Sequence, residues 1–271
     1  MAFVRQLDWD HAEIKLPHGY RGQFLYSGED CHIVATLVPP GAKGPPQHRH
    51  AVDQIYVIVA GTITIQLGDE VRTAGATDTI FIPAGVPHHN WNDGAADEMH
   101  IEVIAPGVLP NQPLAIAADG DSDDRALPYF VRGASSEGPR PEASTITHNW
   151  LVRAEDGSEH ATIYLTSVEP GGSGTRTRIN AFHEFYFVMQ GTLSIAIGLD
   201  RHEAPAGSLV SIPAGVPHRF WNAGRELERH VTTVAPCPSA ANSEDALRAV
   251  EVSLNPTVEH PSPQPAGLAA R

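Results

Sequence analysis

The chain has 271 residues, 41% of them hydrophobic, and a formal net charge of −14 at neutral pH. That negative field repels polyanions, so neither nucleic acid nor an anionic membrane surface is an expected partner. The two cysteines lie far apart, and the N-terminal segment is broken by charges. These features predict a cytoplasmic protein without a disulfide framework, a secretion signal or a transmembrane segment.

One heptapeptide occurs twice in the sequence. IPAGVPH covers residues 82–88 and returns unchanged at 212–218. Trp-Asn and then Ala-Pro follow each copy, and every match is displaced by the same 130 residues. A repeat of this length predicts tandem domains, because solenoid units have only about 20–50 residues. We predict a first domain over residues 1–109, a linker over 110–144, a second domain over 145–238 and a tail over 239–271.

Short strands dominate the predicted elements of both halves. Residues 55–59 are β-branched and aromatic, and the alternating segment 62–67 follows directly after Gly61. This pattern predicts a β-hairpin with Gly61 at its turn, and the second half repeats it around Gly191. Because no long helical pattern interrupts the strands, we predict an all-β protein of the sandwich or barrel type.

The predicted linker and tail differ in composition from the domains. The linker contains an acidic run at 119–124 and a segment rich in Gly, Ser and Pro at 133–144. Between them, the apolar residues 127–131 are expected to pack on a barrel. In the tail, residues 243–250 predict two turns of helix with Ser243 as the N-cap. Four prolines beyond residue 255 predict disorder.

Four side chains in the first half have the pattern of a metal site. His48, His50 and Gln54 occupy even positions, so on an extended strand they share one face. His88 follows the turn formed by the heptapeptide. Three imidazole nitrogens and one amide oxygen can hold a divalent ion and leave room for substrate or water. A chance cluster is the alternative, since the chain contains 15 histidines.

The second half carries different residues at the equivalent positions, namely Arg178, Asn180, Glu184 and His218. Arginine is always protonated and cannot bind a metal ion. A guanidinium pairing with Glu184 would put a fixed positive charge where the first domain would hold its ion. We therefore predict that the second domain is metal-free and structural. Alternatively, Arg178, Glu184 and His218 form a site for a small anion.

Further polar residues lie on the strand that precedes the first Ala-Pro. His100 and Glu102 share one face of that strand and are candidates for general acid–base catalysis near neutral pH. The alternative is that His100 is a structural histidine. The same two roles are open to His230 at the equivalent position of the second half. His89 follows His88 directly, so its parity predicts that it points away from the site.

Together these residues resemble the two motifs of the cupin family. The first motif is matched by His48, His50, Gln54 and Gly61. The second is matched by Pro83, Gly85, His88 and Asn92. Its leading glycine is Thr77 in the first half and Gly207 in the second. The resemblance covers residues 15–236 and implies a bicupin, with two jelly-roll β-barrels in tandem.

Gln54 narrows the chemistry that this resemblance implies. Many cupin oxygenases, including quercetinases, carry glutamate there, and its carboxylate also serves as a base. Glutamine has no accessible pKa and leaves the metal its full charge. Three histidines with one glutamine resemble the ligands of several non-oxidative cupins, including a bicupin isomerase of bacilysin biosynthesis. Neutral ligand sets also occur in three-histidine cupin dioxygenases.

The resemblance leads to one preferred function and two alternatives. We predict one divalent metal ion per chain, with Fe(II) favoured and Mn(II), Ni(II) or Zn(II) as alternatives. The preferred function is a bicupin dioxygenase acting on a small enolisable or phenolic compound. The alternatives are a Lewis-acid isomerase or lyase that uses the same metal, and a non-catalytic small-molecule-binding cupin. The resemblance also makes a homodimer a reasonable expectation.

Overall fold

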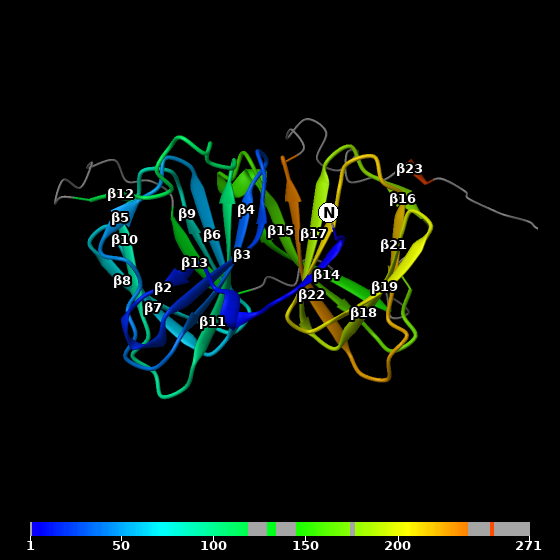
Figure 1. The fold of residues 1–271 in the computed structure, drawn as a ribbon, viewed down its shortest axis with the longest axis horizontal. Coiled ribbons are helices and arrows are strands. Elements are labelled where there is room, and N and C mark those ends of the chain that lie inside the picture. The colour runs from blue at the N-terminus through cyan, green and yellow to red at the C-terminus, as the bar shows by residue number, and fades with distance from the viewer. Residues whose placement is uncertain (1, 119–128, 134–144, 174–176, 238–249, 252–271) are drawn as a thin grey trace, which may run out of the picture.

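The computed structural model describes residues 2–118, 129–133, 145–173, 177–237 and 250–251. Their strands form four antiparallel sheets, and these make two barrels that lie side by side (Figure 1). The described residues contain no α-helix, which confirms the all-β prediction. They do contain three 3-10 helices, η1 (Trp9–His11), η2 (Pro17–Gly19) and η3 (Ala154–Asp156). None of these described helices is long and apolar enough to cross a membrane.

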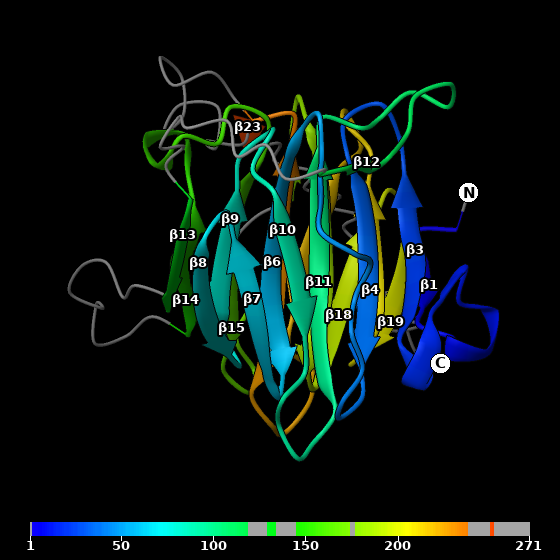
Figure 2. The same ribbon diagram turned by 90° about the vertical axis from the view of Figure 1, so that its left-hand side faces the viewer.

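The first barrel consists of a seven-stranded and a five-stranded sheet. The larger sheet has the order β13-β9-β6-β11-β4-β3-β2, and the smaller has the order β12-β5-β10-β7-β8. Figure 2 shows β7 beside β10 on the smaller, outer sheet. The strands are β2 (Ile14–Lys15), β3 (Arg21–Ser27), β4 (His32–Val38), β5 (His48–Arg49), β6 (Asp53–Ala60), β7 (Thr62–Leu67), β8 (Glu70–Gly75), β9 (Asp78–Ile82), β10 (His88–Trp91), β11 (Glu98–Ala105), β12 (Ile116–Ala117) and β13 (Phe130–Gly133).

The second barrel repeats this plan with a six-stranded and a five-stranded sheet. The orders are β1-β20-β17-β22-β15-β14 and β19-β18-β21-β16-β23. The strands are β1 (Val4–Gln6), β14 (Ile146–Val152), β15 (Thr162–Val168), β16 (Arg178–Ile179), β17 (His183–Gln190), β18 (Thr192–Ile197), β19 (Asp200–Pro205), β20 (Ser208–Ile212), β21 (His218–Trp221), β22 (Glu228–Ala235) and β23 (Val250–Glu251).

Three large apolar clusters hold this arrangement together, and a smaller fourth one contains Tyr164, Phe182 and Val234. One fills the first barrel and includes Ile58 and Ile65, and a second fills the other barrel and includes Val188 and Ile195. The third draws buried residues from the larger sheets of both barrels, which meet in the middle of Figure 1. Alternation along β6 and β17 therefore buries both faces of these strands, one in a barrel and one between the barrels.

The predicted hairpins around Gly61 and Gly191 are wrong, although the strands themselves form. β6 pairs with β9 and β11, whereas β7 pairs with β8 and β10, so the two strands lie in different sheets. Gly61 sits at the corner where the chain crosses from one sheet to the other, with a positive φ of 74°. A side chain there would collide with the main-chain oxygen of Asp97. The glycine therefore marks a close approach in a barrel corner.

The backbone at one corner of the first barrel is strained, whereas the equivalent corner of the second barrel is not. Thr77 has a φ of 71°, and the equivalent Gly207 has a φ of 84°. Both amides donate to a main-chain oxygen across the turn, Thr77 to Ile58 and Gly207 to Val188. The turn therefore needs the left-handed region in both barrels. A β-branched residue enters that region only at a cost of about 1–3 kcal/mol.

Two short strands connect the barrels or fix the linker. β1 pairs with β20 of the second barrel, with Val4 opposite Val210. β13 lies in the predicted linker and pairs with β9, with Phe130 opposite Phe81. The described part of the apolar patch, residues 129–131, thus packs on the first barrel as predicted. Arg132 of the same strand donates to Asp156 in the second barrel.

Other predictions about the linker and tail lie mainly outside the described residues. The acidic run at 119–124, most of the Gly/Ser/Pro-rich segment and the residues beyond 251 fall there. The predicted helix at 243–250 falls there too, except for its last residue, which belongs to β23. The three boundaries between the predicted segments therefore stay predictions.

Candidate metal centre

The predicted ligands come from both sheets of the first barrel. His48 begins β5 and lies directly opposite His88 of β10 in the smaller sheet. His50 follows β5, and a bend at residues 51–52 leads into β6, which carries Gln54. The expectation of one extended strand over residues 48–54 is therefore wrong. The side chains still converge, because the chain changes sheets between them and both sheets face the same interior.

The three histidines form a buried cluster. Their side chains each place one nitrogen within 4.8 Å of the other two. The ring centroids of His48 and His88 are 4.3 Å apart, and His50 lies 5.1 and 5.2 Å from them. The exposed fractions are 7%, 5% and 1% for His48, His50 and His88. This arrangement is a buried triad able to hold a divalent metal ion.

Main-chain carbonyls orient the three rings. Nδ1 of His48 lies 2.8 Å from Pro46 O, Nδ1 of His50 lies 2.5 Å from Leu114 O, and Nδ1 of His88 lies 3.0 Å from Val86 O. Since a carbonyl only accepts, each Nδ1 carries the proton, and each Nε2 is left with a lone pair. This second shell is typical of histidines that bind metals.

Burial also keeps the rings uncharged. Desolvation lowers the pKa of His48 and of His50, and it lowers the pKa of His88 to about 3, with the neighbouring His48 adding to the effect. Neutral imidazole is the form that binds a metal ion. The triad is therefore ready to bind at neutral pH without releasing protons.

Gln54 presents its oxygen to the same space. Its amide nitrogen donates to Glu102 Oε2 over 2.7 Å, which fixes the orientation of the amide. Gln54 Oε1 is then buried without a hydrogen-bond partner among the described residues, as are Nε2 of His50 and Nε2 of His88. Buried polar atoms without partners are rare and need an explanation. A bound cation explains all three, since each atom offers a lone pair.

Glu102 belongs to a buried chain of ionisable groups on β11. His100 Nδ1 lies 2.9 Å from Glu98, and its Nε2 lies 3.3 Å from Glu102, which also accepts from Thr36 over 2.6 Å. Burial lowers the pKa of His100, but the charges and hydrogen bonds of both glutamates outweigh it and raise the pKa to about 10. Burial likewise opposes ionisation of Glu102, but His100 lowers its pKa to about 2.

His100 and Glu102 therefore form a charged pair beside the triad. Both glutamates favour the protonated form of His100, because they raise its pKa above the usual range. The hydrogen bond from Gln54 indicates that Glu102 orients the amide of Gln54. A catalytic role for either residue stays a prediction.

Sequence reasoning missed Glu98, which is fully buried and holds His100. The signal was present, because Glu228 and His230 repeat the pair at the 130-residue displacement and lie 2.9 Å apart. His89 points away from the triad, as predicted, and its Nδ1 donates to Pro45 O.

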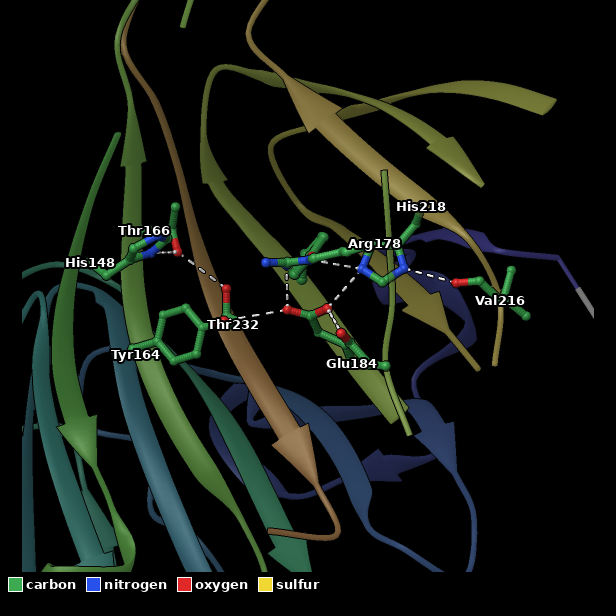
Figure 3. A network of polar contacts seen from close by, with 10 residues as sticks. His148, Tyr164, Thr166, Arg178, Glu184, Val216, His218 and Thr232 are labelled. Atoms are coloured by element: carbon green, nitrogen blue, oxygen red, sulfur yellow. Dashed lines mark hydrogen bonds and ion pairs between the residues drawn. The ribbon is translucent and has the colours of Figure 1, made fainter. Parts of the chain in front are cut away.

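The corresponding place in the second barrel holds a network around a guanidinium (Figure 3). Arg178 donates from Nη2 to Glu184 over 2.7 Å and to Tyr186 over 2.6 Å, which confirms the expected Arg178–Glu184 pairing. Its Nε donates to Nε2 of His218 over 3.0 Å. Asn180 donates to the other oxygen of Glu184 over 2.7 Å. In the second barrel, the positions that correspond to the metal ion and its ligands are thus occupied by side chains that pair with one another.

Comparison with known proteins agrees with the duplicated architecture. A family profile described as "Cupin domain" matches residues 35–104 and 164–234. By structure, the chain is similar to oxalate decarboxylase of Bacillus subtilis, a protein with Mn(II) centres, at a TM-score of 0.67 and 14% identity, covering 86% of this chain and 77% of the other. It is also similar to AerE from Microcystis aeruginosa, at a TM-score of 0.60 and 16% identity, covering 82% and 95%. At these identities the likeness concerns the fold.

Sequence relatives match over shorter stretches. The H2HPP isomerase of Bacillus subtilis is 31% identical over 100 residues, which is 36% of each chain. A mannose-1-phosphate guanylyltransferase of Salmonella muenchen is 33% identical over 79 residues, covering 29% of this chain and 16% of the relative. The matched part is thus well below two thirds of the length of either curated relative.

Proposed function

Because this chain belongs to the cupin family and carries two cupin domains in tandem, we propose that it is a metal-dependent enzyme. In this proposal, the N-terminal barrel acts on a small enolisable compound as a Lewis-acid isomerase or lyase. The observation that carries the proposal is a set of buried donor atoms that have no hydrogen-bond partner among the described residues, Nε2 of His50 and His88 and Oε1 of Gln54. The ligand nitrogens of His50 and His88 lie within 4.8 Å of each other and of that of His48, and the side chain of Gln54 interacts with His50.

The donor set fits a divalent ion. His48, His50 and His88 would hold it through nitrogen, and Gln54 would add its oxygen. A bound ion would supply Lewis-acid chemistry, and with four neutral donors it would keep its full charge for an anionic oxygen of the substrate. Mn(II), Fe(II), Ni(II) and Zn(II) all accept such a set of donors.

The surrounding residues keep this set in place. Glu102 fixes the amide of Gln54, and His100 holds Glu102 ionised. The near-complete burial of the triad keeps bulk water away from the donors, which strengthens any electrostatic interaction with a bound substrate. Gln54 cannot take up a proton, so the proposal assigns it no base function.

The isomerase or lyase is preferred to an oxidative function for two reasons. Gln54 replaces the carboxylate base of many cupin oxygenases, and an isomerase is among the sequence relatives. The second candidate is a Fe(II) dioxygenase acting on a small enolisable or phenolic compound. It is favoured by the donor count, since four protein donors do not fill a six-coordinate shell and leave space for two further ligands.

Metal analysis and an oxygen-uptake assay separate these candidates. We expect one equivalent of divalent metal per chain in the full-length protein and metal-dependent tautomerisation of phenylpyruvate, followed by its enol absorbance, without oxygen consumption. Stoichiometric oxygen uptake during turnover would instead establish the dioxygenase. Tight binding of the compounds without turnover would overturn both and leave a binding protein.

Neighbouring histidines provide a matched pair of variants. His88→Ala removes one of the three nitrogen donors, whereas His89→Ala removes a ring that points away and donates to a carbonyl. We expect the first variant to lose the metal and the second to keep it. Equal metal content in the two variants would show that the triad is not the metal site.

A further inference from the structure

A cavity of about 190 Å³ lies in the second barrel at the place that corresponds to the histidine triad of the first. Arg178 and Glu184, which line it, are displaced by 130 residues from His48 and Gln54. The second barrel thus has other residues at three of the four predicted ligand positions and a hollow at that place. Figure 3 shows the two residues between His218 on one side and Tyr164 with His148 on the other.

The guanidinium in this cavity is only partly used by the protein. Of its five N–H groups, Nε donates to His218, and Nη2 donates to Glu184 and to Tyr186. Among the described residues, the two N–H groups of Nη1 have no hydrogen-bond partner. The side chain is 27% exposed, although Glu184 beside it is only 2% exposed. Arg178 therefore offers a pair of donors to whatever occupies the cavity.

The carboxylate of Glu184 does not accept from the Nη1 donors of Arg178. Its Oε1 accepts from Arg178 and from the Tyr164 hydroxyl over 3.3 Å, and its Oε2 accepts from Asn180. Both carboxylate oxygens are thus directed into the protein. The two N–H groups of Nη1 remain for an acceptor, and a carboxylate is the acceptor whose planar geometry and charge a guanidinium pairs with best.

Apart from Asn180, the rest of the lining consists of ring side chains, His148 among them. Trp150, Tyr164 and Phe182 all face the cavity, and the Trp150 and Tyr164 rings meet edge to face with centroids 5.2 Å apart. By strand pairing, Phe24 and Val34 of the first barrel correspond to Trp150 and Tyr164. The 130-residue displacement gives Val52 for Phe182, so two of the three rings have no aromatic counterpart there. An aromatic wall with a few placed polar groups is typical of sites for small planar molecules.

We propose that the second barrel binds a small aromatic carboxylate. The carboxylate accepts from Nη1 of Arg178, and the ring packs among Trp150, Tyr164 and Phe182. This site is separate from the metal centre of the first barrel and does not depend on the reaction catalysed there. The barrel without a metal site is thus a ligand-binding domain, rather than only a support for the other.

Calorimetric titration of the full-length chain with benzoate tests this site, with benzamide as the neutral comparison. We expect one benzoate to bind per chain in the His88→Ala variant, in which the metal centre of the first barrel cannot hold the carboxylate. Benzamide should bind at least tenfold more weakly, because it lacks the charge that Arg178 recognises. Equal affinity for the two compounds, or no benzoate binding at millimolar concentration, would overturn the proposal.

Two variants locate the binding. Arg178→Met combined with Glu184→Gln removes both charges and leaves neither buried alone, and Trp150→Leu removes one ring without touching the charged network. Each should weaken benzoate binding at least tenfold while the circular dichroism spectrum stays unchanged. The second variant keeps the test decisive if the first fails to fold. Unaltered benzoate affinity in the folded variants would show that the molecule binds elsewhere.

Discussion

Replacing one member of the Arg178–Glu184 pair should destabilise the protein far more than replacing both. Arg178→Met leaves a carboxylate that is 2% exposed without its cation, and Glu184→Gln leaves the guanidinium without its anion. Breaking a buried ion pair from one side costs about 3–5 kcal/mol, because the remaining charge is not compensated. In the double variant no charge is stranded, so its loss of stability should be smaller than the sum of the two single losses.

The pKa of Glu184 gives a second measure of the same interaction. Burial raises this pKa, but the Arg178 charge and the His218 contact outweigh it and lower the value from 4.5 to about 2. Each pKa unit corresponds to about 1.4 kcal/mol, so the carboxylate contributes about 3 kcal/mol. Because the folded pKa is depressed, this stability is fully present above pH 4.5 and is lost as the pH falls towards 2. Glu184→Gln should remove that part of the pH dependence.

Urea denaturation followed by circular dichroism at pH 7 gives the free energy of unfolding of the unmodified protein, the two single variants and the double variant. The coupling energy is the difference between the loss in the double variant and the summed losses in the single variants. We expect a coupling of about 3 kcal/mol. Single losses that add up to the double loss within about 0.5 kcal/mol would refute the view that this pair replaces a metal ion with an internally compensated charge.

Three further changes test the first barrel. His88→Ala should reduce the bound metal to about 0.1 equivalent per chain or less, as measured by mass spectrometry, because it removes one of the three nitrogen donors of the site. Glu102→Gln should weaken metal binding about 10–100-fold in a competitive chelator titration. The reason is that the amide of Gln54 is then free to turn its nitrogen towards the metal site. An unchanged metal affinity would show that Glu102 does not orient Gln54. Thr77→Gly should raise the free energy of unfolding by about 1 kcal/mol, because strain at positive φ outweighs the added chain entropy; a decrease would mean that Thr77 makes contacts worth more than its strain.

The duplicated sequence and its strand patterns predicted two all-β domains, the spacing of His48, His50 and His88 predicted their cluster, and the resemblance to the cupin motifs implied the two barrels. The domains and the cluster follow from local patterns, since turn residues and alternating strands repeat at one displacement. The hairpins around Gly61 and Gly191 could not be predicted correctly from the same pattern. Two consecutive strands have the same sequence pattern whether they pair with each other or lie in different sheets. Which of these happens depends on strands far along the chain, with which each of them pairs.

The charges around the site were also beyond local patterns. Gln54 and Glu102 are 48 residues apart, and the hydrogen bond between them depends on how β6 and β11 are aligned in the sheet. The buried carboxylate of Glu98 lies two residues before His100 on the same strand and, together with Glu102, raises the pKa of the histidine. By contrast, the Arg178–Glu184 pair was predictable, because an arginine and a glutamate replaced two ligands of one already recognised site.

The pairing of β1 with β20 has a consequence for synthesis of the chain. Val4 and Val210 lie in adjacent strands, so β1 leaves the ribosome about 200 residues before its partner exists. At about 5–20 residues per second, this strand waits roughly 10–40 seconds for a place in a sheet. A strand that is made well before its partner is therefore fixed only later, and its docking reports that the second barrel has formed.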